Sequence, residues 1–231
     1  MKSDLRNPPS VPANAPKRIF LVEDHPIFRR GLTHLIESEP GFSVCGHAAS
    51  FPSALDELRR VQADAAILDI AIEGANGLEL VKHVRAEHPG LAILVLSVHD
   101  ESIYGPRALR AGAQGYVMKR ESDDVLLTAI HKVLAGEVYV SPALAGNLLY
   151  RVVYQHDAAD KSQIASLSDR ELEVLELVGQ GLPSRDIGEK LHISVKTVES
   201  HRLHIREKLG LAHASELVRF AIQWAEEQKG M

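Results

Sequence analysis

Short apolar runs alternate with longer amphipathic segments through the first half of the chain. The apolar runs predict five strands, at residues 19–22, 42–45, 65–68, 92–96 and 115–118. Apolar positions three and four residues apart predict helices near residues 28–36, 54–60, 78–86 and 122–134. Apolar strands that alternate with helices form a parallel sheet covered on both faces. We therefore predict an α/β doubly wound sheet of five parallel strands in the flavodoxin-like order 2-1-3-4-5.

The pattern changes after Gly136, and strand signals then disappear. Residues 142–166 predict one short helix and a polar linker, and roughly four helices follow from Leu167. We divide the chain into a leader (1–17), an α/β domain (18–137), a linker with a short helix (138–166) and an all-α domain (167–231). The leader is rich in proline and small polar residues, so we expect it to be disordered.

Composition narrows the class of protein. The chain has 231 residues, of which 45% are hydrophobic and 25% charged, as in ordinary globular proteins. Its one cysteine excludes an internal disulfide and fits a reducing cytosol. No apolar stretch predicts a membrane span or a signal peptide, so we expect a cytoplasmic protein without a membrane partner. The net charge of −5 means that any binding to DNA depends on a local surface.

Polar side chains follow four of the predicted strands directly. Glu23 and Asp24 follow the first strand, Asp69 the third, Ser97 the fourth and Lys119 the fifth. Ligands of open parallel sheets bind beyond the carboxyl ends of the strands, where the strand order reverses. With the first and third strands adjacent, their carboxylates converge and repel each other unless a cation lies between them. Mg²⁺, which prefers oxygen ligands, is therefore the predicted cofactor.

The same residue types suit phosphoryl chemistry. A carboxylate can act as a nucleophile and become an acyl phosphate. Lys119 supplies a positive charge for phosphate oxygens, and Ser97 supplies a hydroxyl donor. Each residue alone is more often a solvated loop group or a helix cap. Their common register at four strand ends favours a phosphate site.

Residues 18–135 resemble the receiver domain of the two-component family. The resemblance lies in Leu-Val-Glu-Asp-His at 21–25, Ile-Leu-Asp at 67–69, Asn-Gly-Leu-Glu-Leu at 76–80, Leu-Ser at 96–97 and Gly-Ala-Gln-Gly-Tyr-Val-Met-Lys at 112–119. It implies that a partner histidine kinase phosphorylates Asp69. It also implies that Glu23 and Asp24 hold Mg²⁺ together with Asp69 and the backbone carbonyl of Ala71.

The resemblance further implies a switch pair, Ser97 and Tyr116. The serine hydroxyl moves toward the phosphate, and the tyrosine ring follows inward.

Several positions depart from the family pattern. Ile72 and Glu73 replace the usual Met-Pro, which adds negative charge near the phosphate and predicts slow or short-lived phosphorylation. Val98 replaces a smaller residue and would narrow access to the site. Gly105-Pro106 falls where the fourth helix should run, and proline disrupts a helix interior. We expect this helix to be short or mobile, and its face to be unusually plastic.

The second domain carries a helix-turn-helix pattern. Ser168 and Glu171 form a capping box at the start of the first helix. A second helix opens at Ser184, and a longer one runs over residues 195–209 after a tight turn. A short helix, a tight turn and a longer helix are typical of major-groove DNA binding.

The periodicity of the longer helix separates two faces. Val198, His201, Ile205 and Leu209 are predicted to pack inward. On the exposed side, Lys196, Thr197 and Arg202 are candidates for phosphate contacts, and Ser200 is exposed beside them. Glu199 could accept a hydrogen bond from cytosine or be a solvated charge, and Leu203 could touch a thymine methyl group.

Residues 167–224 resemble the LuxR-type DNA-binding domain, through Leu-Ser-Asp-Arg-Glu-Leu-Glu-Val-Leu at 167–175 and Ile-Ser-Val-Lys-Thr-Val-Glu-Ser-His at 193–201. The whole chain is similar to the NarL/FixJ branch of response regulators. This implies a homodimer, joined through the last helix at 215–224, that reads a pseudo-palindromic site in double-stranded DNA. It also implies that the protein is not a metabolic enzyme and loses its phosphoryl group by slow self-catalysed hydrolysis.

Two alternatives stay open at this point. A phosphohydrolase similar to haloacid dehalogenases would need a second Asp two residues after its nucleophile, where this chain has Pro26 or Ala71. The other alternative is a phosphorylation-independent transcription factor whose receiver is a dimerisation scaffold. The departures at Ile72, Glu73 and Gly105-Pro106 favour this second alternative, and the complete acid set argues against it.

Overall fold

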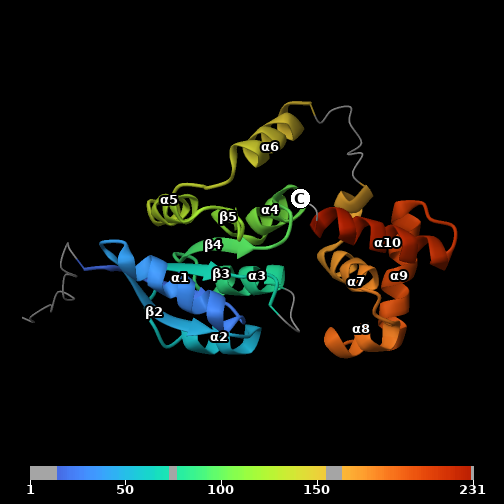
Figure 1. Ribbon diagram of the computed structural model, residues 1–231, viewed down its shortest axis with the longest axis horizontal. Coiled ribbons are helices and arrows are strands. Elements are labelled where there is room, and N and C mark those ends of the chain that lie inside the picture. Colours follow the sequence, from blue (N-terminus) through green and yellow to red (C-terminus); the bar gives the residue numbers. More distant parts are fainter. Residues whose placement is uncertain (1–14, 73–76, 155–162, 230–231) are drawn as a thin grey trace, which may run out of the picture.

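The computed structural model describes residues 15–72, 77–154 and 163–229. An α/β domain and a helical domain lie beside each other, and helix α6 lies along one side of the first domain (Figure 1). Most of the predicted leader, residues 1–14, lies outside the described residues, and the first strand already begins at Lys17.

The sheet has the predicted order. Its strands are β1 (Lys17–Val22), β2 (Phe42–Ala48), β3 (Ala65–Leu68), β4 (Ala92–Ser97) and β5 (Gly115–Met118). All neighbours pair in parallel in the order β2-β1-β3-β4-β5. Val22 lies opposite Leu68, so the residues that follow β1 and β3 emerge at the same edge.

Five helices cover the sheet: α1 (Pro26–Ser38), α2 (Phe51–Leu58), α3 (Gly77–Glu87), α4 (Glu101–Ala111) and α5 (Asp123–Leu134). Successive residues of a strand point to opposite faces. Phe20 and Val22 therefore pack with α2, α3 and α4, whereas Ile19 and Leu21 pack with α1 and α5. Both faces are buried, as the apolar strands predict.

Helix α4 corrects one expectation. It runs unbroken for 11 residues with Pro106 in its interior, so the prediction of a short helix was wrong. Proline removes one backbone donor, but packing holds the helix in place. Tyr104, Gly105 and Arg107 are buried, and a side chain at Gly105 would collide with Leu144 of α6. The expected plasticity of this face stays a prediction.

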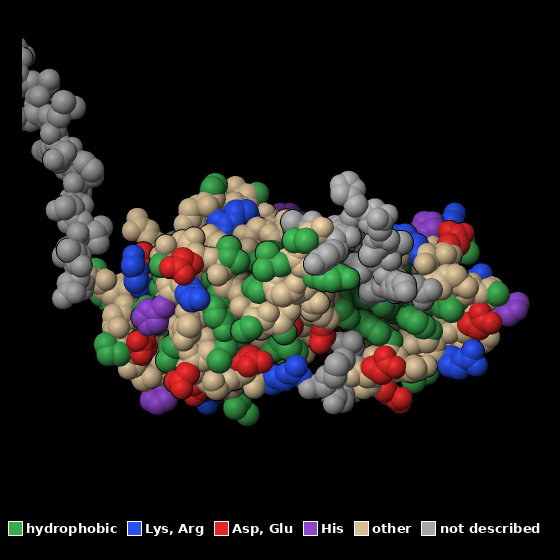
Figure 2. All heavy atoms as spheres, turned by 90° about the horizontal axis from the view of Figure 1, so that it is seen from above, with side chains coloured by type: hydrophobic (Ala, Val, Ile, Leu, Met, Phe, Trp, Pro, Cys, Tyr) green, Lys and Arg blue, Asp and Glu red, His purple; other side chains and the backbone are tan. Residues whose placement is uncertain are grey.

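The segment between the domains is more structured than expected. Helix α6 (Pro142–Tyr154) has 13 residues, and the 3₁₀ helix η1 (Gln163–Ser166) precedes the second domain. Before α6, Tyr139 accepts a hydrogen bond from the Tyr116 N–H at 3.1 Å, which extends the edge of the sheet. Figure 2 shows hydrophobic side chains exposed on the face that carries α6, a helix in which Leu149 and Val153 are more than half exposed.

The second domain contains α7 (Asp169–Gly179), α8 (Ser184–Lys190), α9 (Val195–Leu209) and α10 (Ala214–Lys229). The predicted capping box at Ser168 is present. Gly188 is required by packing, because a Cβ atom there would lie 2.8 Å from the carbonyl oxygen of Ile193. In the part of the chain that the structure describes, no helix is long and apolar enough to cross a membrane.

Candidate phosphorylation site and DNA-binding face

The acids that follow β1 and β3 meet around one lysine. Lys119 Nζ lies 2.6 Å from Glu23 Oε2 and 2.7 Å from Asp69 Oδ2. The side chains of Glu23 and Asp69 are each 2% exposed, and that of Lys119 is 11% exposed. Buried charges persist when they are paired and hydrogen-bonded, as these three groups are. The parallel register of β1, β3, β4 and β5 brings together residues that are up to 96 positions apart.

Burial and pairing act on the titration of this cluster in opposite directions. Burial raises the pKa of Asp69, while the Lys119 ammonium and the backbone N–H of Ala71 oppose the rise. Burial by itself lowers the pKa of Lys119, but the carboxylates of Asp69 and Glu23 outweigh it, so the net pKa is raised. Lys119 therefore stays charged and provides the counter-charge for any anion formed at Asp69.

Oxygen donors for a cation gather beside Asp69. Ligand atoms of Glu23, Asp24 and His25 lie within 4.8 Å of one another. Asp24 Oδ1 pairs with the exposed His25 Nδ1 at 2.7 Å, and the Ala71 N–H donates to Asp69 Oδ1 at 2.7 Å. Three carboxylates from two strand ends are a donor set that suits a hard divalent cation such as Mg²⁺. The residues present therefore fit the predicted cofactor.

The predicted switch residues are both fully buried. Ser97 Oγ accepts the His99 N–H at 3.2 Å, and the Tyr116 hydroxyl donates to the His99 carbonyl at 2.8 Å. The Tyr116 ring is already buried without a phosphoryl group, and the inward movement that the resemblance implies stays a prediction. Ile72 is buried in the core, whereas Glu73 lies outside the described residues.

A contact between the two domains was not predicted from the sequence. The Arg107 side chain, which is 6% exposed, donates to Asp169 Oδ1 at 2.8 Å and to the carbonyls of Ile164 and Leu167 at 3.2 and 2.8 Å. Tyr104 and Arg107 share an i, i+3, i+4, i+7 face of α4 with Ala108 and Ala111. An arginine on such an apolar face is the signal that could have indicated a buried partner.

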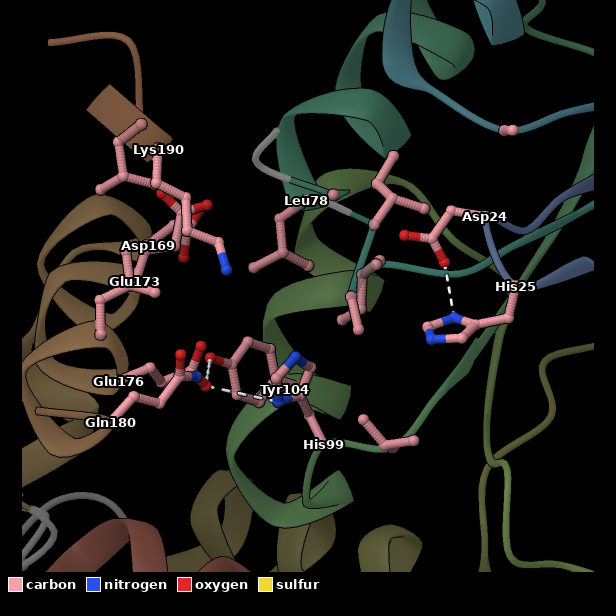
Figure 3. A pocket seen from close by; sticks show the side chains of 18 of the residues that line it. Asp24, His25, Leu78, His99, Tyr104, Asp169, Glu173, Glu176, Gln180 and Lys190 are labelled. Atoms are coloured by element: carbon pink, nitrogen blue, oxygen red, sulfur yellow. Dashed lines mark hydrogen bonds and ion pairs between the residues drawn. The ribbon is translucent and has the colours of Figure 1, made fainter. Parts of the chain in front are cut away.

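A cavity of 820 Å³ lies between the domains. Residues near Asp69, including Asp24 and Ala71, line one side, and residues of α7, including Glu173 and Glu176, line the other. Figure 3 shows Glu176 facing Tyr104 and His99 across this boundary. The second domain therefore lies over the edge of the sheet at which phosphoryl chemistry is expected.

The predicted DNA-binding face of α9 is not covered by the first domain. Lys196, Thr197, Glu199, Ser200 and Leu203 are all exposed. Their helix begins at the N-cap Ser194, whose hydroxyl accepts the N–H of Thr197 at 3.1 Å.

Arg202 is placed differently from the other candidates. Its side chain is 19% exposed and donates to Ser184 Oγ of α8 at 2.7 Å. The same hydroxyl donates to Glu199, so the three side chains form one network across the two helices. On the opposite side of α9, Val198, Ile205 and Leu209 are buried as predicted, and His201 is half-buried.

Both domains match known families. Residues 19–131 match the response regulator receiver domain, and residues 165–221 match the bacterial regulatory proteins of the luxR family. The oxygen regulatory protein NreC of Staphylococcus haemolyticus is 34% identical over 210 residues, which cover 89% of this chain and 97% of NreC. This chain belongs to the NarL/FixJ-type response regulators.

Further relatives of this response regulator include the transcriptional regulatory protein DegU of Brevibacillus brevis, 31% identical over 214 residues, or 87% of this chain and 91% of DegU. A solved LuxR-family response regulator from Aurantimonas is 35% identical, covering 60% of this chain and 99% of its own, with a TM-score of 0.56. RcsB of Salmonella enterica bound to promoter DNA shares the fold, with a TM-score of 0.66 at 24% identity over 89% of this chain and 98% of RcsB.

Proposed function

We propose that this response regulator accepts a phosphoryl group on Asp69 from a sensor histidine kinase and uses it to control binding to double-stranded DNA. The observation that carries the proposal is the cluster in which Lys119 bridges Glu23 and Asp69. The Asp69 carboxylate is buried, oriented by a backbone N–H and placed beside a charged lysine. It is therefore positioned to act as a nucleophile while the lysine stabilises negative charge that forms beside it.

The reaction at Asp69 is a phosphoryl transfer. A carboxylate oxygen of Asp69 attacks phosphorus, and the phosphorus–nitrogen bond of the donor phosphohistidine breaks, leaving its electron pair on the imidazole nitrogen. Glu23, Asp24, Asp69 and the backbone carbonyl of Ala71 would hold Mg²⁺, which would supply positive charge for the phosphoryl oxygens. Lys119 then exchanges its contact with the Asp69 carboxylate for one with a phosphoryl oxygen.

Ser97 and Tyr116 respond to the phosphoryl group. The Ser97 hydroxyl donates to a phosphoryl oxygen, and the Tyr116 ring, which is already buried, shifts further toward the space that this movement leaves. Hydrolysis of the acyl phosphate returns the carboxylate. No side-chain carboxylate stands two residues beyond Asp69, where Ala71 is found. We therefore infer slow self-catalysed hydrolysis and not a metabolic phosphohydrolase.

DNA binding is assigned to α9. A homodimer joined through α10 places two copies of this helix in successive major grooves of a pseudo-palindromic site. Lys196, Thr197 and Arg202 contact phosphates, and Glu199, Ser200 and Leu203 face the base edges. The exposed side chains of α9 support this assignment, although Arg202 must leave Ser184 to reach a phosphate.

The test of phosphorylation uses the full-length protein with acetyl phosphate and Mg²⁺, scored by intact mass. Wild-type protein should gain one phosphoryl group, and Asp69→Asn should gain none. A duplex selected from a random library by the phosphorylated protein then serves as the DNA probe. Phosphoryl uptake by Asp69→Asn, or equal affinity of both forms of the wild type for that duplex, would contradict the proposal.

A further inference from the structure

His99 stands at the boundary between the phosphorylation site and the second domain. It lies between the end of β4 and the start of α4, two residues after Ser97. Its backbone contacts the first domain, while its imidazole faces α7 of the second domain (Figure 3). No role for this residue follows from the phosphorylation chemistry described above.

Both switch residues bind the backbone of His99. Ser97 Oγ accepts its N–H at 3.2 Å, and the Tyr116 hydroxyl donates to its carbonyl at 2.8 Å. The next residue, Asp100, is the N-cap of α4 and accepts the Ser102 N–H at 2.8 Å. A displacement of either switch side chain therefore acts directly on the peptide that carries the His99 side chain and begins α4.

The side chain of His99 reaches across the domain boundary. His99 Nδ1 lies 3.3 Å from Glu176 Oε1, and the imidazole stacks on Tyr104 with ring centroids 4.4 Å apart. The Tyr104 hydroxyl donates to the same Glu176 carboxylate. The side chains of His99 and Glu176 are 25% and 20% exposed, so this contact is largely shielded from solvent. Glu176 is thus held by two groups of the first domain.

We propose that His99 is a positioning residue that transmits the phosphorylation state of Asp69 to the second domain. The proposal rests on the proposed phosphorylation of Asp69 and adds the path by which it is read. When the Ser97 hydroxyl turns toward a phosphoryl oxygen, the His99 N–H either follows it or loses its acceptor. Either outcome moves the imidazole relative to Glu176 and weakens the contact that keeps α7 docked on α4.

The chain contains its own reporter of docking. Trp224 is the only tryptophan in the sequence and is 7% exposed. Together with His99 and Lys119 it lines a second cavity between the domains, of 430 Å³. Its emission maximum therefore responds to separation of the two domains.

The experiment compares the emission of Trp224 before and after treatment with acetyl phosphate and Mg²⁺, with phosphoryl uptake scored by intact mass. His99→Ala removes the imidazole and keeps the backbone contacts. His99→Asn keeps a side-chain nitrogen near the position of Nδ1. His131→Ala is the matched control, since it removes another His–Glu pair, 3.0 Å from Glu39, far from the domain boundary.

At dilutions that keep the chain monomeric, so that α10 is not covered by a second copy, we expect phosphorylation to shift the wild-type emission to the red. The loss of the imidazole contacts with Glu176 and Tyr104 should raise the undocked fraction of His99→Ala about tenfold. Its emission should therefore start nearer the phosphorylated value and change less. His99→Asn should restore most of the wild-type change, and His131→Ala should retain it fully. Amide exchange of α7 should follow the same order.

Two results would overturn the inference while leaving the proposed function intact. One is a full wild-type emission change in His99→Ala with normal phosphoryl uptake. The other is normal uptake by the wild type with no change in Trp224 emission or α7 exchange. Absence of phosphoryl uptake by the wild type would instead refute the proposed function and, with it, the inference that depends on it.

Discussion

Arg107 provides the sharpest test of how the two domains are held together. Replacement by Met keeps an apolar side chain of similar length and removes all three donations, to Asp169 and to the carbonyls of Ile164 and Leu167. Asp169 retains Lys82 at 3.2 Å, so its charge keeps one partner. The carbonyls of Ile164 and Leu167 lose the Arg107 donor.

The magnitude follows from these contacts. A hydrogen bond to a charged group contributes about 1.5–3 kcal/mol when it is shielded from solvent. Hydrogen bonds to carbonyls contribute less, because these carbonyls bind water once the domains separate. The sum is about 2–4 kcal/mol, because the Arg107 side chain is almost fully buried while Asp169 is partly solvated and doubly paired. At about 1.4 kcal/mol per factor of ten, the undocked fraction should rise roughly 30- to 1000-fold.

Amide hydrogen exchange measures this change in the undocked fraction in the full-length protein. In Arg107→Met, the protection of η1 and of the first turn of α7 should fall, while that of β1 and β3 should stay at the wild-type level. Arg110→Met is the control, because Arg110 is exposed on the same helix. If protection of η1 and α7 changed less than about threefold, Arg107 would not stabilise the docked arrangement and the reasoning from its burial would be refuted.

Three further predictions concern separate parts of the molecule. Lys119→Met leaves the buried acids Glu23 and Asp69 without their shared cation. Phosphoryl uptake, measured by intact mass, should be abolished, and Tm near neutral pH should fall by an amount equivalent to about 3 kcal/mol of stability. An unchanged Tm would contradict this. Burial raises the pKa of Glu173 to about 7, so the contribution of this group to the free energy of unfolding should be fully present below about pH 4.5 and be lost as the pH rises through 7, by at most about 3 kcal/mol. In urea titrations, Glu173→Gln should flatten this pH dependence. An equal slope in the variant and the wild type would count against the prediction. Gly188→Ala should lower stability by about 1–2 kcal/mol although alanine favours helices, because its Cβ would lie 2.8 Å from a carbonyl oxygen of the next turn; a raised Tm would show that the turn yields instead.

The sheet and its edge could be predicted because both depend on short-range patterns. Apolar strands alternating with helices indicate a parallel sheet, and the residue after each strand then falls at a known edge. This reasoning placed Glu23, Asp69 and Lys119 in one predicted cluster, and the structure brings them within hydrogen-bond distance.

Features that depend on tertiary packing were not predictable in the same way. Pro106 suggested a break in α4, but burial against α6 and the second domain keeps the helix intact. The apolar face of α4 indicates that Arg107 has a buried partner, but the identity of that partner, Asp169, 62 positions away, cannot be predicted from the helix pattern. Docking of two domains depends on surface shape and on long-range pairs, which carry no periodic signal in the sequence.

The exposed face of α9 has a consequence for how DNA binding is controlled. Because α7 and η1 carry the contact with the first domain, the docked chain still presents α9 to a groove. The same docking places Trp224, near the end of α10, against the first domain. A single half-site would then be bound equally well by docked and undocked chains, and discrimination would arise only on full sites. Control in such a protein acts on cooperativity between two bound copies and leaves the intrinsic affinity of each recognition helix unchanged.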